Sequence, residues 1–214
     1  MAPAAVSKRK SAVATLKRGL ILDAARRVFE AEGLEGASLR SIAAESGYTP
    51  AALYFHFDSK EALYAEVLSQ SLAALKDRVD GAVAAAPTAA LRFRAAALAF
   101  FDFYADNPRD LDLGFYLFRG GMRPRGVGRA RDAALNSTLA AGLAPIVDAT
   151  HELGASRTNA RLLMADTFAH ASGVLLLLHT HRIRLFGVAP RTLMERYVND
   201  QIAKLTQRAS HNIR

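Results

Sequence analysis

The stretch SLRSIAAESGYTPAALYFHF, residues 38–57, decides the fold of this chain. Ser38 can cap a first helix, because its hydroxyl can accept a hydrogen bond from a free backbone N–H of the first turn. Gly47 stands where that helix must end, since glycine adopts the left-handed C-terminal conformation without steric cost. Thr49 can cap a second helix, and Pro50 occupies its first position, where a missing N–H costs nothing. The pattern predicts two short helices joined by a tight turn.

Two helices joined by a glycine-containing turn are the signature of a helix-turn-helix unit, whose second helix enters the DNA major groove. Leu39, Ile42 and Ala43 fall on one face of the first helix. An ordinary helical hairpin in an all-α core has the same periodicity, so spacing alone leaves that alternative open.

The order of residues around the unit favours DNA binding. The segment ILDAARRVFEAEGLEGASLRSIAAESGYTPAALYFHFDSKEALYAEVL resembles the DNA-binding domain of the TetR family of bacterial transcriptional repressors, and LYFHF, Ser59-Lys60-Glu61 and Leu63 are its most specific part. The resemblance runs over residues 16–68, about a quarter of the chain. It implies an all-α protein with an N-terminal three-helix helix-turn-helix domain and a C-terminal helical domain for ligand binding and dimerisation.

Composition is that of a globular protein, since 51% of the 214 residues are hydrophobic and 22% are charged. The chain has no cysteine, which excludes disulfides, thiolate metal sites and cysteine nucleophiles and suits a cytoplasmic location. Residues 1–10 lack the apolar core of a signal peptide. The apolar run over residues 174–178 is far shorter than the ~20 residues that span a bilayer, so no membrane partner is expected.

Positive charge gathers at the N-terminus. The net charge is +8, which favours polyanionic partners. The first 18 residues carry five basic side chains and no acidic one, whereas residues 19–60 carry four basic and six acidic side chains. The helix-turn-helix is therefore not a basic patch in itself. The N-terminal cluster is interpreted either as a solvated tail or as an arm that touches DNA.

The hydrophobic pattern predicts about nine helices and no alternating strands. We expect a disordered basic tail over residues 1–10, a helix-turn-helix domain over 11–70 and an effector-binding and dimerisation domain over 71–214. Leu16 belongs to the predicted apolar stripe of the first helix, and Pro145 is expected to kink a later one. Outside the helix-turn-helix, the predicted helices cover residues 11–32, 60–85, 88–106, 109–118, 128–153, 156–184 and 190–208.

Base reading is expected from the N-terminal end of the second helix, which points into the groove. Thr49 can hydrogen-bond a base or a phosphate, while Pro50 and Ala51 can make only apolar contacts, for instance with thymine methyl groups. Arg40, on the first helix, is a candidate for a base or phosphate contact.

The family resemblance supplies further DNA contacts. Tyr54, His56 and Lys60 match positions that hold the DNA backbone, and Lys17 matches the start of the supporting helix near the phosphates. Core packing is the alternative for the tyrosine and the histidine. Ser38 is a weaker candidate at the start of the first helix. One short recognition helix reads few bases, and the family implies a homodimer on a palindromic double-stranded operator.

The family's dimer interface consists of the last two long helices of each subunit. Ala165, Ala169 and Gly173 are four residues apart and permit close approach of another helix. A central helix packed within one chain is the alternative interpretation.

The resemblance also implies a small-molecule effector pocket among the C-terminal helices. Aromatic residues at helical spacing are more often ordinary core, but an aromatic lining would suit an apolar or aromatic ligand. Asp102, Asn136 and His170 are the polar groups expected to orient it. The expected apolar lining comprises Phe100, Phe103, Tyr104, Phe115, Phe118, Leu139, Leu163, Phe168 and Val174.

The sequence gives no sign of metal or cofactor chemistry. His179 and His181 would project about 200° apart on a helix, which is poor geometry for one ion. No nucleophile–base pair or glycine-rich phosphate loop is apparent, so we do not expect an enzyme. A ligand-released repressor is the leading interpretation. The alternatives are an activator or ligand-independent repressor, and an all-α binding protein or enzyme without DNA function.

Overall fold

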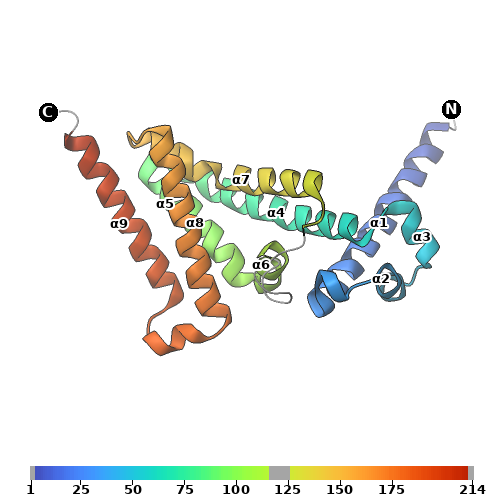
Figure 1. Cartoon of the computed structure of the whole chain (residues 1–214). Coiled ribbons are helices and arrows are strands. Elements are labelled where there is room, and N and C mark those ends of the chain that lie inside the picture. The colour runs from blue at the N-terminus through green and yellow to red at the C-terminus, as the bar shows by residue number, and fades with distance from the viewer. Residues whose placement is uncertain (1–2, 116–125, 212–214) are drawn as a thin grey trace. The chain divides into compact units, whose positions relative to one another are not determined.

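The computed structural model describes residues 3–115 and 126–211, and these ranges contain nine α-helices, one 3-10 helix and no strand (Figure 1). They form two compact units. The first comprises Met1–Gln70 and Asp112–Leu135, and the second comprises Ser71–Leu111 and Asn136–Arg214. The predicted division between residues 70 and 71 did not assign residues 112–135 to the first unit. The Tyr64 hydroxyl donates to the Leu113 carbonyl over 2.7 Å, a contact that links α4 (Lys60–Ala84) to the end of α6 (Pro108–Phe115) within this unit.

The first unit contains α1 (Pro3–Gly36), α2 (Leu39–Ser46), α3 (Pro50–His56) and the start of α4 (Lys60–Ala84). Apolar residues from all four helices form its core, which accounts for the helical spacing seen in the sequence. The most deeply buried of them are Ile21, Ala24, Ala25, Ile42, Leu53, Leu63 and Val67.

Residues 1–10 were predicted to be disordered, but α1 begins at Pro3. Proline is favourable at the first helical position, and the alanines, lysines and arginines that follow are strong helix formers. At the other end, Gly33 has φ 70° and ψ 176°, so the regular helix is interrupted there, close to the predicted end at residue 32.

Leu16 was predicted to be part of the buried stripe of α1, and this is wrong. Its side chain is 66% exposed, and Val13 and Leu20 are also largely exposed. The buried stripe begins only at Ile21. Helical periodicity identified the apolar face of α1 but not the length over which the rest of the unit covers it.

The helix-turn-helix has the predicted end signals. The Ser38 hydroxyl accepts a hydrogen bond from the Ser41 N–H over 3.0 Å, and the Ser41 hydroxyl in turn accepts one from the Ser38 N–H. Gly47 is left-handed at φ 72°. The Thr49 hydroxyl accepts from the Ala52 N–H over 3.3 Å, and Pro50 is the first residue of α3.

The second unit is built on α5 (Ala89–Asp106), α8 (Arg157–His179) and α9 (Pro190–His211), each of which packs against the other two. The 3-10 helix η1 (Arg182–Phe186) packs on α8. The unit boundaries fall inside α4, α6 (Pro108–Phe115) and α7 (Arg129–Glu152), and Pro145 lies within α7. Its core includes the fully buried rings of Phe93, Phe100 and Phe101.

The predicted helix over residues 156–184 is shorter in the structure, where α8 ends at His179. His181 adopts a left-handed conformation with φ 58°, which cannot continue an α-helix. The chain then forms η1, which ends at Gly187, also left-handed.

By length and composition, α8 is apolar enough to cross a membrane, with a mean hydropathy of 1.4. The core helix of a water-soluble protein passes the same test, so this feature is weak support for a membrane span. Only 28% of its apolar window is buried, however, so much of the α8 surface is uncovered within one chain.

The left-handed turn gives a stability prediction with a matched control. Gly47→Ala should lower the free energy of unfolding by about 1–2 kcal/mol, because a Cβ is unfavourable at φ 72°. Gly81→Ala, inside α4, should raise it by about 0.5–1 kcal/mol, because an added Cβ meets nothing within 4 Å and glycine weakens a helix interior. Urea unfolding followed by circular dichroism measures both. Equal midpoints for the two variants would contradict the prediction.

Candidate DNA interface and ligand pocket

One face of α3 is open to solvent. Leu53 is fully buried and fixes the helix to the core, while Thr49, Pro50 and Ala51 at its N-terminal end are exposed. Tyr54 is 61% exposed, which excludes the core-packing alternative for this residue. The predicted base-reading residues and this phenol are therefore all accessible to a bound duplex.

Phe55 is a surface residue that the sequence analysis missed. Its side chain is 87% exposed, and its ring lies edge-on to that of His56 with centroids 5.3 Å apart. The signal was present in the spacing: Leu53 and Phe57 face the core one turn apart, so the residue midway between them must face outward. An exposed aromatic ring on a recognition helix can contact sugars or thymine methyl groups.

Arg18 joins three helices of the first unit. Its guanidinium forms an ion pair with Glu66 of α4, with Nε 2.8 Å from Oε1, and donates to the His56 carbonyl at the end of α3. It also lies 4.5 Å from the centre of the Phe57 ring. The charge of Arg18 therefore holds α1, α3 and α4 together.

Lys60 is likewise engaged inside the first unit. Its ammonium donates to the carbonyls of Leu34, Glu35 and Ala37 at distances of 2.8, 3.3 and 3.2 Å. These contacts place a positive charge at the C-terminal end of α1, where it interacts favourably with the helix dipole. Because an ammonium has three donors, this role competes with the predicted phosphate contact.

Arg40 and Lys17 differ from Arg18 and Lys60, which are engaged inside the first unit. Both side chains are exposed, and Arg40 has no ion-pair or hydrogen-bond partner among the residues that the structure describes. Arg27, by contrast, is paired with Glu45 over 2.6 Å. The guanidinium of Arg40 is thus free to meet a polyanion. Ser38 is exposed too, although its hydroxyl caps α2.

The predicted ligand-lining aromatics lie together in the second unit. Phe100, Phe103 and Tyr104 are buried, and both phenylalanine rings meet Tyr104 edge-on with centroids 5.1 Å apart. The ring centroid of Phe168, on α8, lies 5.7 Å from that of Phe100. Burial raises the pKa of the Tyr104 phenol far above its usual range. These rings pack on one another as a core does.

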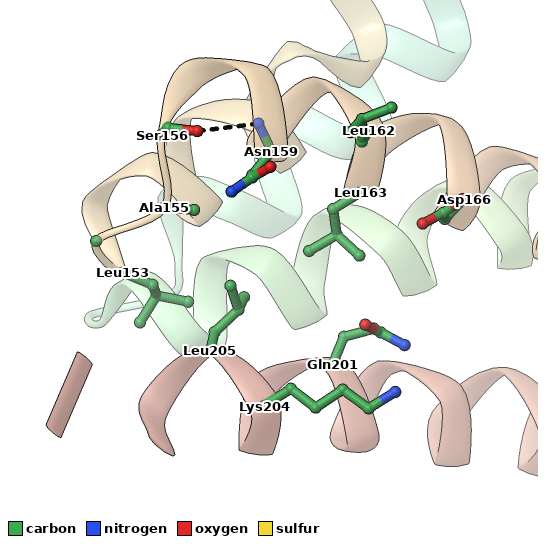
Figure 2. A pocket seen from close by; sticks show the side chains of 11 residues that line it. Leu153, Ala155, Ser156, Asn159, Leu162, Leu163, Asp166, Gln201, Lys204 and Leu205 are labelled. Atoms are coloured by element: carbon green, nitrogen blue, oxygen red, sulfur yellow. Dashed lines mark hydrogen bonds between the residues drawn. The ribbon is translucent and has the colours of Figure 1, made fainter. Parts of the chain in front are cut away.

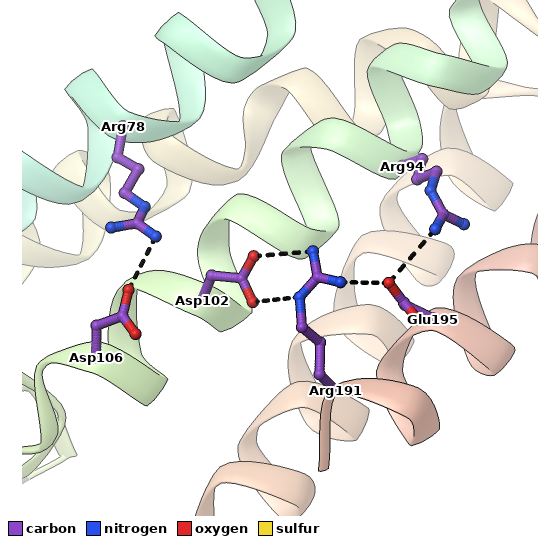
Figure 3. Close-up of polar contacts among 6 residues, drawn as sticks. All are labelled: Arg78, Arg94, Asp102, Asp106, Arg191 and Glu195. Carbon is purple, nitrogen blue, oxygen red and sulfur yellow. Dashed lines mark hydrogen bonds and ion pairs between the residues drawn. The ribbon is translucent and has the colours of Figure 1, made fainter. Parts of the chain in front are cut away.

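Asp102 was predicted to orient a ligand, and the structure gives it another role (Figure 3). Its carboxylate binds Arg191 of α9 through two contacts of 3.1 and 3.3 Å, and Arg191 also pairs with Glu195. These contacts raise the pKa of Arg191. An ion-pair network on the α5–α9 surface therefore accounts for Asp102, which a sequence without tertiary information could not show.

The remaining predicted pocket residues have different environments. Asn136 is exposed on α7, which does not fit a buried ligand contact, whereas Val174 is buried. The His170 ring stacks on Tyr197 at 4.2 Å, its buried Nε2 has no hydrogen-bond partner in the described structure, and burial lowers its pKa. Phe118, the side chain of Phe115 and most of the arginine-rich loop 119–131 lie outside the described residues.

A pocket of about 580 Å³ lies elsewhere in the second unit, between α8, α9 and the turn before α8 (Figure 2). Its apolar lining includes Leu153, Leu163 and Leu205. Its polar lining includes Asn159, Asp166, Gln201 and Lys204. Leu163 alone was among the residues expected to line a pocket. No group of three or more His, Asp or Glu side chains suited to a metal occurs in the described part of the chain.

The fold and the exposed α3 face define an all-α protein of the helix-turn-helix DNA-binding class. Residues 21–67 match the model of bacterial regulatory proteins of the tetR family. Residues 21–67 therefore form a helix-turn-helix domain of the tetR type, and the curated relatives that share it are transcriptional regulators.

Two relatives share this region. The chain is 39% identical over 99 residues, 46% of its length, to the HTH-type transcriptional activator FasR of Mycolicibacterium smegmatis. It is 37% identical over 68 residues, 30% of its length, to the HTH-type transcriptional regulator UidR of Escherichia coli K12. These matches span 45% of FasR and 35% of UidR, so the chain covers less than half the length of either relative.

The fold as a whole resembles solved regulators. The structure of FadR from Bacillus subtilis, in complex with stearoyl-CoA, superposes with a TM-score of 0.63 at 16% identity, covering 86% of this chain and 96% of FadR. At that identity the likeness shows a shared fold and nothing about ligands.

The structural role of Lys60 can be measured against Lys17. Lys60→Ala should lower the free energy of unfolding by about 1–3 kcal/mol, because three helix-end carbonyls lose a charged donor. Lys17→Ala, at an exposed position, should change it by less than about 0.5 kcal/mol. Denaturant unfolding of both variants checks this, and an unchanged stability for Lys60→Ala would show that the carbonyl contacts contribute nothing.

Proposed function

We propose that this chain is a DNA-binding transcriptional repressor that acts as a homodimer on a palindromic operator and is released by an apolar or aromatic small molecule. The observation that carries the proposal is the exposed recognition face of α3 inside a segment that matches the tetR family over residues 21–67. FasR is an activator by name, so whether this chain represses or activates transcription is a separate part of the proposal.

In this proposal α3 lies in the major groove. Pro50, Ala51 and Phe55 would contact base edges through apolar groups, and Thr49 would add a hydrogen bond. Tyr54 and His56 would donate to phosphates from the same helix. Lys17, Arg40 and Ser38 would add contacts from α1 and the start of α2. Since Arg18 and Lys60 are engaged within the unit, Arg40 and Lys17 become the principal cationic contacts.

A homodimer follows from the small size of the reading surface. Helix α3 has seven residues, so one copy reads few bases, and two half-sites about one or more DNA turns apart would supply the missing affinity. The uncovered surface of α8, together with α9, is the proposed contact between copies.

The effector would bind in the second unit, among the aromatic residues contributed by α5 and α8. Ser71 of α4 supports a site in this unit, because its buried hydroxyl has no hydrogen-bond partner among the described residues and such groups call for a ligand or water. Stearoyl-CoA in FadR makes acyl chains the first ligand class to test. To release the operator, the ligand must bind the state without DNA more tightly by a few kcal/mol.

Salt dependence tests the DNA contacts. Arg40→Ala should weaken operator binding. It should also make the negative slope of log K against log salt concentration shallower by about 1, because one phosphate contact no longer releases counterions. Lys76→Ala, which removes a half-buried lysine paired with Asp80 in the second unit, should leave the slope unchanged. Fluorescence anisotropy over a range of salt concentrations measures both variants. Equal slopes for Arg40→Ala and the unmodified protein would remove Arg40 from the interface.

Thermal unfolding tests the effector. Saturated fatty acids and their CoA thioesters should raise the unfolding midpoint, and the increase should grow with chain length because more apolar area is buried. Phe168→Ala should diminish the response, whereas Leu185→Ala, at an 82% exposed position on η1, should not. A midpoint that no chain length shifts would contradict an acyl ligand.

A further inference from the structure

The connection between α8 and α9 carries the two most exposed large apolar side chains in the described part of the second unit. Leu185 is 82% exposed and Phe186 is 62% exposed, and both belong to η1. Val188, which follows the turn at Gly187, is 41% exposed. Scattered apolar residues on a surface need no explanation, but neighbouring ones mark an interaction site.

The same connection is positively charged. Arg182 and Arg184 are exposed, and neither guanidinium has a hydrogen-bond or ion-pair partner among the residues that the structure describes. Arg191 differs, because it is held in the ion-pair network of Figure 3. The sequence contains no acidic residue between Asp166 and Glu195. Unpaired cations and exposed apolar groups thus form one surface, the η1 patch, which consists of Arg182, Arg184, Leu185, Phe186 and Val188.

The segment that carries the η1 patch is anchored to the second unit. Ile183, in the middle of η1, is only 7% exposed, and the His179 ring at the end of α8 makes a hydrogen bond of 2.9 Å with the Tyr104 carbonyl. His181 has φ 58°, a conformation that is unfavourable for a residue with a Cβ and that redirects the chain after α8. The apolar side chains of the patch are therefore exposed although their backbone is held in place.

We propose that the η1 patch is a docking surface for an anionic lipid bilayer. Arginines near a bilayer are attracted to anionic headgroups, and aromatic and aliphatic side chains beside them enter the interfacial region. The contact is peripheral, since only the tip of the α8–α9 connection enters the interface and no helix has to cross the membrane.

Other partners fit the η1 patch less well. A five-residue 3-10 helix offers neither the long amphipathic face nor the strand edge by which proteins bind peptide segments. Three apolar side chains also bury far less than the about 800 Å² per partner of a stable protein interface. Nucleic acid would account for the arginines through its phosphates, but it gives no reason for an exposed leucine and valine beside them.

Tryptophan fluorescence tests insertion, because the chain contains no native tryptophan. Emission from Phe186→Trp should shift to shorter wavelength with vesicles of phosphatidylglycerol and phosphatidylcholine in equal parts, and it should stay unchanged with phosphatidylcholine alone. Leu91→Trp, at a 46% exposed position on α5, is the matched reporter outside the patch and should shift with neither. Equal shifts from the two reporters, or no shift from Phe186→Trp, would overturn the proposal.

Vesicle co-sedimentation tests the charge. Arg182→Gln/Arg184→Gln should lower the partition coefficient on the anionic vesicles by roughly thirtyfold, since each basic residue at an anionic surface contributes about a factor of five. Arg157→Gln/Arg161→Gln removes the same charge from two exposed positions at the opposite end of α8. It should lower the coefficient by less than about twofold, because charges beyond the Debye length are screened.

The two arginine pairs also separate the alternatives. Equal losses for both pairs would show that the net charge of +8 alone causes the binding, and would overturn the proposal. Random-sequence duplex DNA that binds the unmodified chain but not Arg182→Gln/Arg184→Gln, without any binding to vesicles, would assign the η1 patch to nucleic acid instead. Circular dichroism of all variants should match that of the unmodified chain, so that a lost contact is distinguished from a lost fold.

Discussion

The DNA-facing surface depends on how a seven-residue helix is held in place. Isolated helices of that length are unstable in water, so α3 cannot keep its shape by itself. Burial of Leu53, the Thr49 cap and the left-handed turn at Gly47 determine its position. Arg18 then ties its C-terminal end to α1 and α4, and Lys60 ties the start of α4 to the end of α1. These contacts fix the neighbours of α3 to one another and thereby position the recognition surface.

The same contacts limit the charge available for DNA. Two basic residues that a sequence comparison would assign to phosphates are engaged with Glu66 and with backbone carbonyls. Only a few exposed cations, among them Arg40 and Lys17, lie near α3 in the chain, and residues 19–60 are acidic on balance. In the proposed homodimer, two copies acting together would supply the affinity that one copy lacks.

Local chemistry made much of this structure predictable. Caps and turns are encoded by residues a few positions apart, so Ser38, Gly47, Thr49 and Pro50 located α2 and α3 correctly. Pairings between distant residues were not predictable: Asp102 meets Arg191 across 89 positions, and Lys60 meets Leu34 across 26. The exposure of Leu16 depends on where the core ends, which periodicity alone does not specify. The ligand-lining residues were chosen by composition, and most of those described belong to core or surface.

The most direct test is selection from a library of random double-stranded DNA followed by sequencing, with Tyr54→Ala as a control that leaves the buried core untouched. A dimer reading through α3 should enrich a palindrome with two half-sites about one or more DNA turns apart, and the variant should fail to retain it. Enrichment of no sequence, with equal weak binding by both proteins, would leave only charge-driven adhesion and would contradict the assignment of α3 as a recognition helix.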